Sequence, residues 1–196
     1  MSLLLVPSAF AAGDDGPVLP EEPEILAKAA LLMDYNTDAV VYAQNEHEEL
    51  YPASLTKIMT ALLVLDAVEA GKLTLDQEVT ASASALDGLP SDGSTANIKA
   101  GETMSVRNLL YCMLVVSANE ACDILAEEVA GSVSAFVEKR NEKAEALGCE
   151  NTHFVNPNGI HADNHYSTVY DLALMGQYAM KNADFKRIVA MEECQL

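Results

Sequence analysis

The longest apolar segment of the chain directly follows two polar side chains, Ser54 and Lys57. From residue 58 to residue 65 almost every position is apolar, so a helix over this segment has no polar face. A helix that is apolar all round is buried in the protein interior. Pro52 suits the first turn of a helix, where its missing N–H costs nothing. The pattern therefore predicts a buried helix that starts near Pro52 and ends near Gly71.

Two shorter apolar runs precede this helix and predict a pair of strands. Residues 28–35 and 39–43 are apolar at most positions, and the polar turn Asn36-Thr37-Asp38 separates them. Two such runs around a short turn indicate an antiparallel hairpin. A sheet of two strands is marginally stable by itself, and after residue 100 the sequence predicts no further strand.

The remainder of the chain is mainly helical in pattern. A short strand-like segment, Glu78-Val79-Thr80, lies among loops marked by glycine and proline. Periodicity and capping residues then predict helices over residues 103–116, 117–131, 132–148, 169–182 and 184–191. Thr103 or Ser105 is expected to cap the first of these helices. A hairpin followed by a block of helices indicates a mixed α/β fold of the α+β type.

The length and the charge of the chain narrow its class. With 196 residues it is long enough for one domain with a sizeable core, which we place at residues 25–196. Its 30 acidic residues against 11 basic residues give a net charge of −19. Such a charge repels nucleic acid and anionic membrane surfaces, so neither is expected as a partner.

The N-terminal residues predict export. Residues 1–12 hold a short apolar run and Ala9-Phe10-Ala11, which is similar to a signal-peptide cleavage site, although the usual positive start is lacking. Residues 13–24 are acidic and contain proline and glycine, as in a linker. We interpret residues 1–12 as part of a signal peptide and expect an extracytoplasmic protein of the cell envelope. An apolar tail without a signal function is the alternative.

Ser54 and Lys57 are the first candidates for chemistry. They are three residues apart, so on a helix their side chains share one face. A serine hydroxyl becomes a good nucleophile when a neighbouring base takes its proton. A lysine serves as that base when it is neutral, and bringing its pKa from about 10.4 to near 7 costs roughly 4–5 kcal/mol, a shift that burial favours. The alternative is structural: Ser54 caps the helix and Lys57 lies at the surface.

Ser117 and Asn119 form a second candidate pair at the start of a later helix. A functional role requires that they face Ser54 and Lys57 across a cleft. The alternative is a capping box, because Ser117 and Glu120 match the pattern S-x-x-E.

The cysteines and histidines do not indicate a metal centre. The sequence has four cysteines, Cys112, Cys122, Cys149 and Cys194, and none of them forms a C-x-x-C pair. Cys112 and Cys122 lie in apolar helical stretches and are expected to be buried thiols. The spacing of His161 and His165 would place two ligands on one face of a helix, but the turn residues before them predict a loop.

Several motifs together resemble one known family. They are Ser54-Leu55-Thr56-Lys57, Ser117-Ala118-Asn119, Asn156-Pro157-Asn158-Gly159 and residues 165–173. In this order they closely resemble the serine D-alanyl-D-alanine carboxypeptidases, the low-molecular-mass penicillin-binding proteins of peptidase family S11. The resemblance runs from about Lys28 to the end of the chain, and it implies a β-lactamase/transpeptidase-like fold.

The resemblance also implies roles for the candidate residues. Ser54 would attack the carbonyl of the penultimate D-alanine of a peptidoglycan stem peptide, and Lys57 would take its proton. Ser117 would pass a proton to the leaving D-alanine, and Asn119 would hold the substrate amide and Lys57. β-Lactams would acylate the same serine. No metal and no organic cofactor is implied.

The third motif of the family, Lys-Thr-Gly, has no counterpart in this sequence. In the family it lies on a strand downstream of the second motif, recognises the substrate carboxylate and completes the oxyanion hole. The loss of one oxyanion donor alone costs about 10²–10³ in rate. We therefore expect a truncated member, with the remaining strands and any membrane anchor not represented, that is weakly active or inactive.

Two other functions remain open from the sequence. A non-catalytic envelope protein that keeps the fold and binds stem peptide would account for the missing third motif. A serine β-lactamase would need a carboxylate that activates the deacylating water, and no E-x-x-L-N pattern follows Ser117. Penicillin distinguishes the three: slow turnover indicates a carboxypeptidase, fast turnover a β-lactamase, and no adduct an incomplete site.

Overall fold

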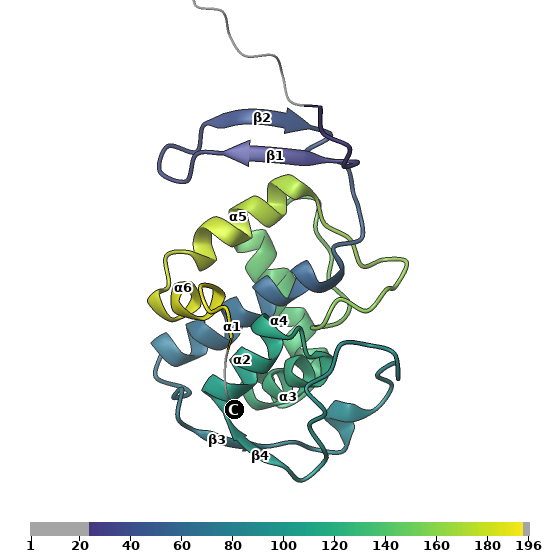
Figure 1. The fold of residues 1–196 in the computed structure, drawn as a ribbon, viewed down its shortest axis with the longest axis vertical. Coiled ribbons are helices and arrows are strands. Elements are labelled where there is room, and N and C mark those ends of the chain that lie inside the picture. The colour runs from purple at the N-terminus through teal and green to yellow at the C-terminus, as the bar shows by residue number, and fades with distance from the viewer. Residues whose placement is uncertain (1–23, 194–196) are drawn as a thin grey trace, which may run out of the picture.

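The computed structural model describes residues 24–193. A β-hairpin lies at one end, a block of helices lies beneath it, and a second short pair of strands lies at the opposite end (Figure 1). The predicted signal segment, residues 1–12, and all but the last residue of the predicted linker, residues 13–24, lie outside the described residues.

The hairpin consists of β1 (Ala30–Met33) and β2 (Val40–Gln44), which pair antiparallel as predicted. The Asp34 carboxylate closes the turn between them, because it accepts hydrogen bonds from the main-chain N–H groups of Asn36 and Thr37. Such an aspartate turn gives the backbone polar groups partners where the strand ladder ends.

Helix α1 (Lys57–Glu69) lies in the middle of the helical block (Figure 1). The predicted helix does not start as one continuous element, because a 3-10 turn, η1 (Ala53–Thr56), precedes α1. Ala53 at the start of this turn has a φ of 47°. The rest of the prediction is confirmed: most apolar side chains of α1 are buried, and Gly71 follows shortly after its end.

The second strand pair joins β3 (Glu78–Thr80) to β4 (Thr103–Ser105) in antiparallel order. The prediction of a helix from residue 103, and of no strand after residue 100, was therefore wrong. These residues are extended because their main chain pairs with β3, a partner that the local sequence pattern does not reveal. Ser105 then caps α2 (Val106–Val115) by accepting a hydrogen bond from the N–H of Asn108.

The other helices lie within a few residues of their predicted bounds. They are α3 (Asn119–Ala130), α4 (Val133–Ala146), α5 (Val169–Ala179) and α6 (Ala183–Val189). A short 3-10 turn, η2 (Ser84–Leu86), comes between β3 and β4 in the sequence. Gly131 and Gly148 have positive φ just after α3 and α4, and such left-handed residues end helices. Helix α5 packs against β1 and so connects the hairpin to the helical block (Figure 1).

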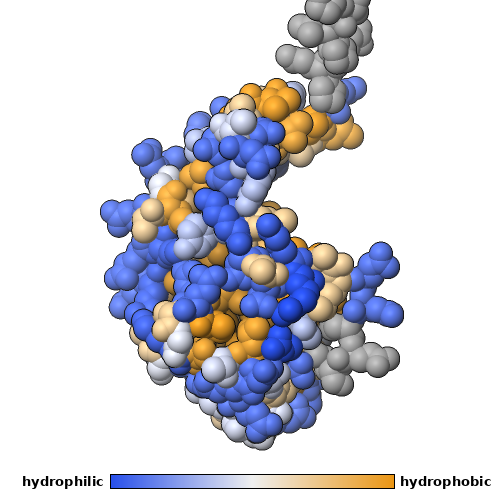
Figure 2. All heavy atoms as spheres, turned by 90° about the vertical axis from the view of Figure 1, so that its left-hand side faces the viewer, coloured by the Kyte–Doolittle hydropathy of each residue, from blue (hydrophilic) through white to orange (hydrophobic). Residues whose placement is uncertain are grey.

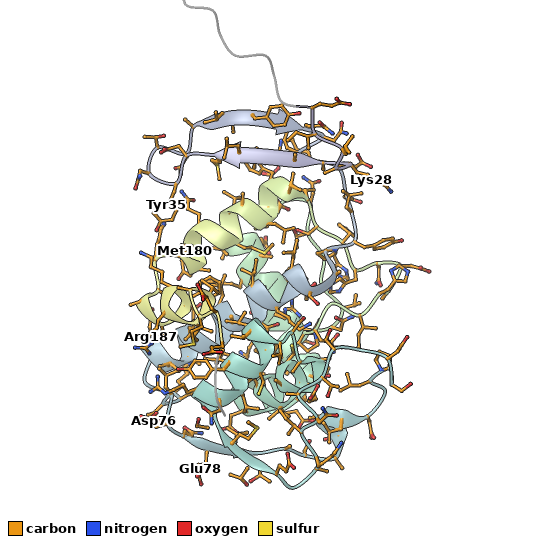
Figure 3. All side chains as sticks on the ribbon, viewed as in Figure 1. Lys28, Tyr35, Asp76, Glu78, Met180 and Arg187 are labelled. Atoms are coloured by element: carbon orange, nitrogen blue, oxygen red, sulfur yellow. The ribbon has the colours of Figure 1, made fainter. Side chains whose placement is uncertain are left out.

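The hairpin projects beyond the helices, and the molecular outline is hollowed below it (Figure 2). Lys28 and Tyr35 lie toward its two ends, whereas Asp76 and Glu78 lie at the opposite end of the molecule (Figure 3). No helix within residues 24–193 is long and apolar enough to cross a membrane. Short antiparallel sheets combined with a block of helices confirm the predicted mixed α/β class.

Candidate active site

Four side chains from two stretches of the chain, residues 54–57 and 117–119, meet at the N-terminal end of α1. Ser54 lies in η1, Lys57 opens α1, Ser117 precedes α3, and Asn119 opens α3. Ser117 Oγ donates a hydrogen bond of 2.9 Å to Ser54 Oγ. Lys57 Nζ lies 3.1 Å from Ser54 Oγ and 2.9 Å from Asn119 Oδ1. The fold thus brings together all four candidate residues, which are up to 65 positions apart in the sequence.

The hydrogen-bond partners of Lys57 suit a lysine that gains and loses a proton. The third acceptor of its Nζ is the main-chain oxygen of Asn158, at 2.7 Å. As an ammonium group, Lys57 has one N–H for each of its three acceptors. As a neutral amine it keeps two N–H groups for the oxygens of Asn119 and Asn158 and can turn its lone pair to the Ser54 hydroxyl. The neutral form is then positioned to take the Ser54 proton.

Burial favours the neutral form of this lysine. Lys57 is 2% exposed, and burial lowers its pKa below the usual range, because the charged form loses its hydration. The Arg140 guanidinium nearby lowers the pKa further, whereas the carboxyl groups of Asp123 and Glu120 oppose the shift. The structural alternative for this pair is wrong: Lys57 is not at the surface, and no side chain caps η1 or α1.

Ser117 is aimed at Ser54 by its backbone. Its φ of 61° lies in the left-handed region that residues with a side chain rarely adopt. Glu120 does not form a capping box with it, because the Glu120 carboxylate accepts hydrogen bonds from Thr95 Oγ1 and from the N–H of Ala96. The capping-box alternative is therefore wrong, and the Ser117 hydroxyl is available to Ser54.

The loop from Asn156 to Gly159 lies behind the site and supports it through its main chain. Three successive main-chain carbonyl groups of this loop accept hydrogen bonds from buried side chains. The pairs are Asn156 with Arg140, Pro157 with Thr60, and Asn158 with Lys57. The sequence signal for this role is the Asn-Pro-Asn-Gly motif itself.

Gly159 allows this loop to lie directly against the Ser54 turn. Its φ is 92°, and a Cβ at this position would lie 2.0 Å from the Ala53 carbonyl oxygen and 3.1 Å from the Ser54 nitrogen. No side chain fits into that space, so only glycine permits this contact.

The histidines do not converge on a common point. His165 is buried, and its Nε2 lies 2.8 Å from Thr56 Oγ1, while its Nδ1 accepts a hydrogen bond from the N–H of Val155. Since Nδ1 is the acceptor, Nε2 carries the proton and donates to Thr56. His161 instead packs edge-on against Tyr51. His165 therefore holds Thr56, which lies between Ser54 and Lys57, whereas His161 contacts Tyr51.

Ser54, Lys57 and Ser117 line an open hollow of about 630 Å³. The rest of its lining is mainly apolar and comes from η1, α1, α2 and α6, with Pro52, Ala53, Leu55, Ile58, Met113, Leu114, Phe185 and Val189. Ser54 is exposed to this space, whereas Lys57 is buried behind it. A substrate carbonyl can therefore reach the serine without displacing the lysine.

Comparison with known proteins gives a consistent result. The sequence profile of the family described as D-alanyl-D-alanine carboxypeptidase matches residues 17–195. The chain is 39% identical over 181 residues to D-alanyl-D-alanine carboxypeptidase DacF of Bacillus subtilis, which covers 92% of this chain and 45% of that protein. It is 40% identical to DacD of Escherichia coli, over 87% of this chain and 44% of that protein.

Solved structures agree with the sequence comparison. The D-alanyl-D-alanine carboxypeptidase DacD of Francisella tularensis superposes with a TM-score of 0.85 at 37% identity, over 91% of this chain and 43% of that one. Penicillin-binding protein 6B of Escherichia coli superposes with a TM-score of 0.86 at 35% identity, over 92% of this chain and 58% of that one. The chain thus spans about half the length of these relatives, and by sequence and fold it belongs to the D-alanyl-D-alanine carboxypeptidase family, peptidase family S11.

Proposed function

We propose that this chain carries the acylating part of a serine D-alanyl-D-alanine carboxypeptidase site. The observation that supports this most is the position of Ser54 Oγ, which lies within hydrogen-bond distance of both Lys57 Nζ and Ser117 Oγ. A serine nucleophile needs a base on one side and a proton relay toward the leaving group on the other. Here the two partners come from different elements and meet at one oxygen.

In the proposed reaction, Ser54 Oγ attacks the carbonyl carbon of the penultimate D-alanine while its proton passes to neutral Lys57. The C–N bond then breaks as Ser117 gives its hydroxyl proton to the leaving nitrogen of the terminal D-alanine, and the proton held by Lys57 replaces it, so that both side chains return to their starting forms. Water hydrolyses the resulting ester, which releases the shortened stem peptide and restores Ser54. The Ser54 main-chain N–H is a proposed donor to the oxyanion that forms during attack.

The substrate, the inhibitors and the location belong to the same proposal. Members named D-alanyl-D-alanine carboxypeptidase or penicillin-binding protein are among the relatives, which supports a peptidoglycan stem peptide as substrate and β-lactams as acylating inhibitors. The strongly negative net charge supports the absence of nucleic acid as a partner. Since stem peptides lie outside the cytoplasm, we place the protein in the cell envelope, with residues 1–12 as part of an export signal, residues 13–24 as a linker and residues 25–196 as the domain.

Intact-mass spectrometry after incubation with penicillin tests the proposal. We expect one penicillin mass to appear slowly on the parent chain and none on Ser54→Ala. Ser134→Ala, which removes an exposed serine of α4, is the matched control and should acylate like the parent. A parent chain that is folded by circular dichroism but forms no adduct would contradict the proposal and favour a non-catalytic binding protein. Rapid loss of the adduct would instead indicate a β-lactamase.

A further inference from the structure

A buried carboxylate lies behind the lysine and has no role in the proposed reaction. Asp123 is on α3 and is 7% exposed, and burial raises its pKa to about 7. Among the described residues its oxygens have one hydrogen-bond partner, the side-chain Nδ2 of Asn158, at 3.2 and 3.4 Å. A carboxyl group with a single neutral partner is costly inside a protein, where an apolar side chain of the same size would pack more favourably.

The partner of Asp123 carries the main-chain oxygen that Lys57 uses. Asn158 is 3% exposed, and its main-chain oxygen accepts the 2.7 Å hydrogen bond from Lys57 Nζ. The two ends of one asparagine therefore connect Asp123 to the lysine. The Asn158 Oδ1 atom is also occupied, because it accepts a hydrogen bond from the N–H of Ile160. With both ends of its amide held, the residue has a fixed orientation.

Asp123 lies outside the catalytic hollow, by which we mean the space of about 630 Å³ that Ser54, Lys57 and Ser117 line. Asp123 and Asn158 line a separate hollow of about 350 Å³ between residues 84–89 and 156–160. None of Ser54, Lys57, Ser117 and Asn119 lines it. A substrate in the catalytic hollow thus does not contact Asp123, so any effect of this residue on the chemistry passes through Asn158 or through its charge.

We propose that Asp123 is a positioning residue: by holding the side-chain amide of Asn158, it fixes the main-chain carbonyl that orients Lys57 toward Ser54. This inference rests on the proposed role of Lys57 as the base. It assigns to α3 a second contribution to the site besides Asn119, which reaches Lys57 through Asn158.

Two uncharged variants separate the hydrogen bond from the charge. Asp123→Asn keeps an oxygen that can accept the hydrogen bond from Asn158, whereas Asp123→Leu has the same branching at Cγ and no acceptor. Both remove the same negative charge near Lys57, so its effect cancels between them. The pKa of Lys57 is measured in each by NMR titration of chains with labelled lysine, with the Lys57 signal identified by its loss in Lys57→Arg.

We expect the pKa of Lys57 to be about one unit lower in Asp123→Leu than in Asp123→Asn, because the ammonium form loses a well-placed acceptor. The difference should disappear when both variants also carry Asn158→Ala, since the connection is then absent. Glu128→Gln removes an exposed carboxylate from the same helix and should leave the pKa of Lys57 as in the parent.

Equal pKa values in the two Asp123 variants, or a higher value in Asp123→Leu, would overturn the inference. A difference that persists in the Asn158→Ala background would overturn it as well, because the effect would then not pass through Asn158. If Asp123→Leu fails to fold, Asp123→Ala replaces it in the same comparison. The titration does not require acylation. Failure to form a penicillin adduct would therefore contradict the proposed function, whereas the comparison of Lys57 pKa values tests the role of Asp123 separately.

Discussion

At the scale of single residues, the site depends on close contacts that one methyl group would abolish. Gly159 is the clearest instance, because its Cα hydrogens face the Ala53 carbonyl at the turn that presents Ser54. The contact joins a loop near residue 159 to a turn more than 100 positions earlier. Position 159 therefore constrains the turn that holds Ser54, although it contributes no functional group.

Gly159→Ala should destabilise the protein by about 3 kcal/mol or more, since a left-handed residue with a side chain costs about 1–2 kcal/mol and overpacking adds about 1–3. Gly71→Ala is the matched control. Its φ is also positive, at 68°, but a Cβ there would contact nothing within 4 Å, so only the backbone cost of about 1–2 kcal/mol applies. Urea denaturation of both variants measures the difference. Equal losses would show that the Ala53 contact is not restrictive.

His165 should make the protein sensitive to acid. Burial lowers its pKa to about 4, from about 6.5 in an unfolded chain. Between these values the unfolded state binds a proton that the native state does not, so the free energy of unfolding falls as the pH falls from 6.5 to 4. His165→Gln removes this contribution, and its free energy of unfolding should fall less than that of the parent over this range.

Denaturation at each pH gives the free energies of unfolding of the parent and of His165→Gln, and the difference between these two values is followed across the pH range. Asp123, with a pKa raised to about 7, contributes a slope of opposite sign over the same range, and it is present in both chains. Parallel curves for the parent and His165→Gln would contradict the prediction.

At the scale of secondary-structure elements, one residue decides where a strand becomes a helix. The sequence allowed either Thr103 or Ser105 as the cap of α2. In the structure Thr103 pairs across the short sheet through its hydroxyl group with Thr80, whereas Ser105 accepts the hydrogen bond from the N–H of Asn108. The choice follows from the pairing of β4 with β3, which extends the chain up to Ser105.

Ser105→Ala should lower the free energy of unfolding by about 1 kcal/mol, the usual effect of removing an N-terminal cap. Thr103→Ala removes an exposed hydroxyl group and should change it by about 0.5 kcal/mol or less. Thermal unfolding of the two variants compares them directly. A larger loss for Thr103→Ala than for Ser105→Ala would mean that the sheet contact, and not the cap, stabilises this junction.

At the scale of the whole molecule, one buried arginine joins the parts that form the site. Arg140 on α4 is 0% exposed, and it donates to the main-chain oxygens of Asn156 and Thr56 while its guanidinium lies 4.3 Å from the centre of the Phe154 ring. It therefore connects α4 to the Ser54 turn and to the loop behind Lys57. Loss of this connection should affect the assembly of all three.

Arg140→Met should lower the free energy of unfolding by about 2–6 kcal/mol, because two buried carbonyl groups lose their donor at about 1–3 kcal/mol each. Lys139→Met is the control, since the neighbouring lysine is exposed and its loss should cost little. We also expect slower penicillin acylation in Arg140→Met under conditions where the chain is folded. Stability equal to that of Lys139→Met would show that water satisfies these carbonyl groups.

The local pattern of apolar, polar and glycine residues was enough to predict the secondary-structure elements that depend only on residues close by in the sequence. The apolar run after Lys57, the Asn36-Thr37-Asp38 turn and the glycines after α3 and α4 predicted their structures correctly, because periodicity and left-handed turns act over a few residues. The motif Ser54-x-x-Lys57 likewise indicated these two residues as a candidate nucleophile and base, and the fold places their side chains 3.1 Å apart. The strand at residues 103–105 was missed because its partner lies more than 20 positions away.

Only the tertiary structure decided how the candidates become a site. It placed Ser117 against Ser54 through a left-handed backbone, and it buried Lys57 among oxygens from α3 and the Asn158 loop. It also placed the Asp123 carboxylate against the side-chain amide of Asn158, a contact that no sequence motif indicates. These features depend on which side chains are buried and on which remote segments lie side by side. Both are decided when the helices pack together, so a local pattern of residues does not predict them.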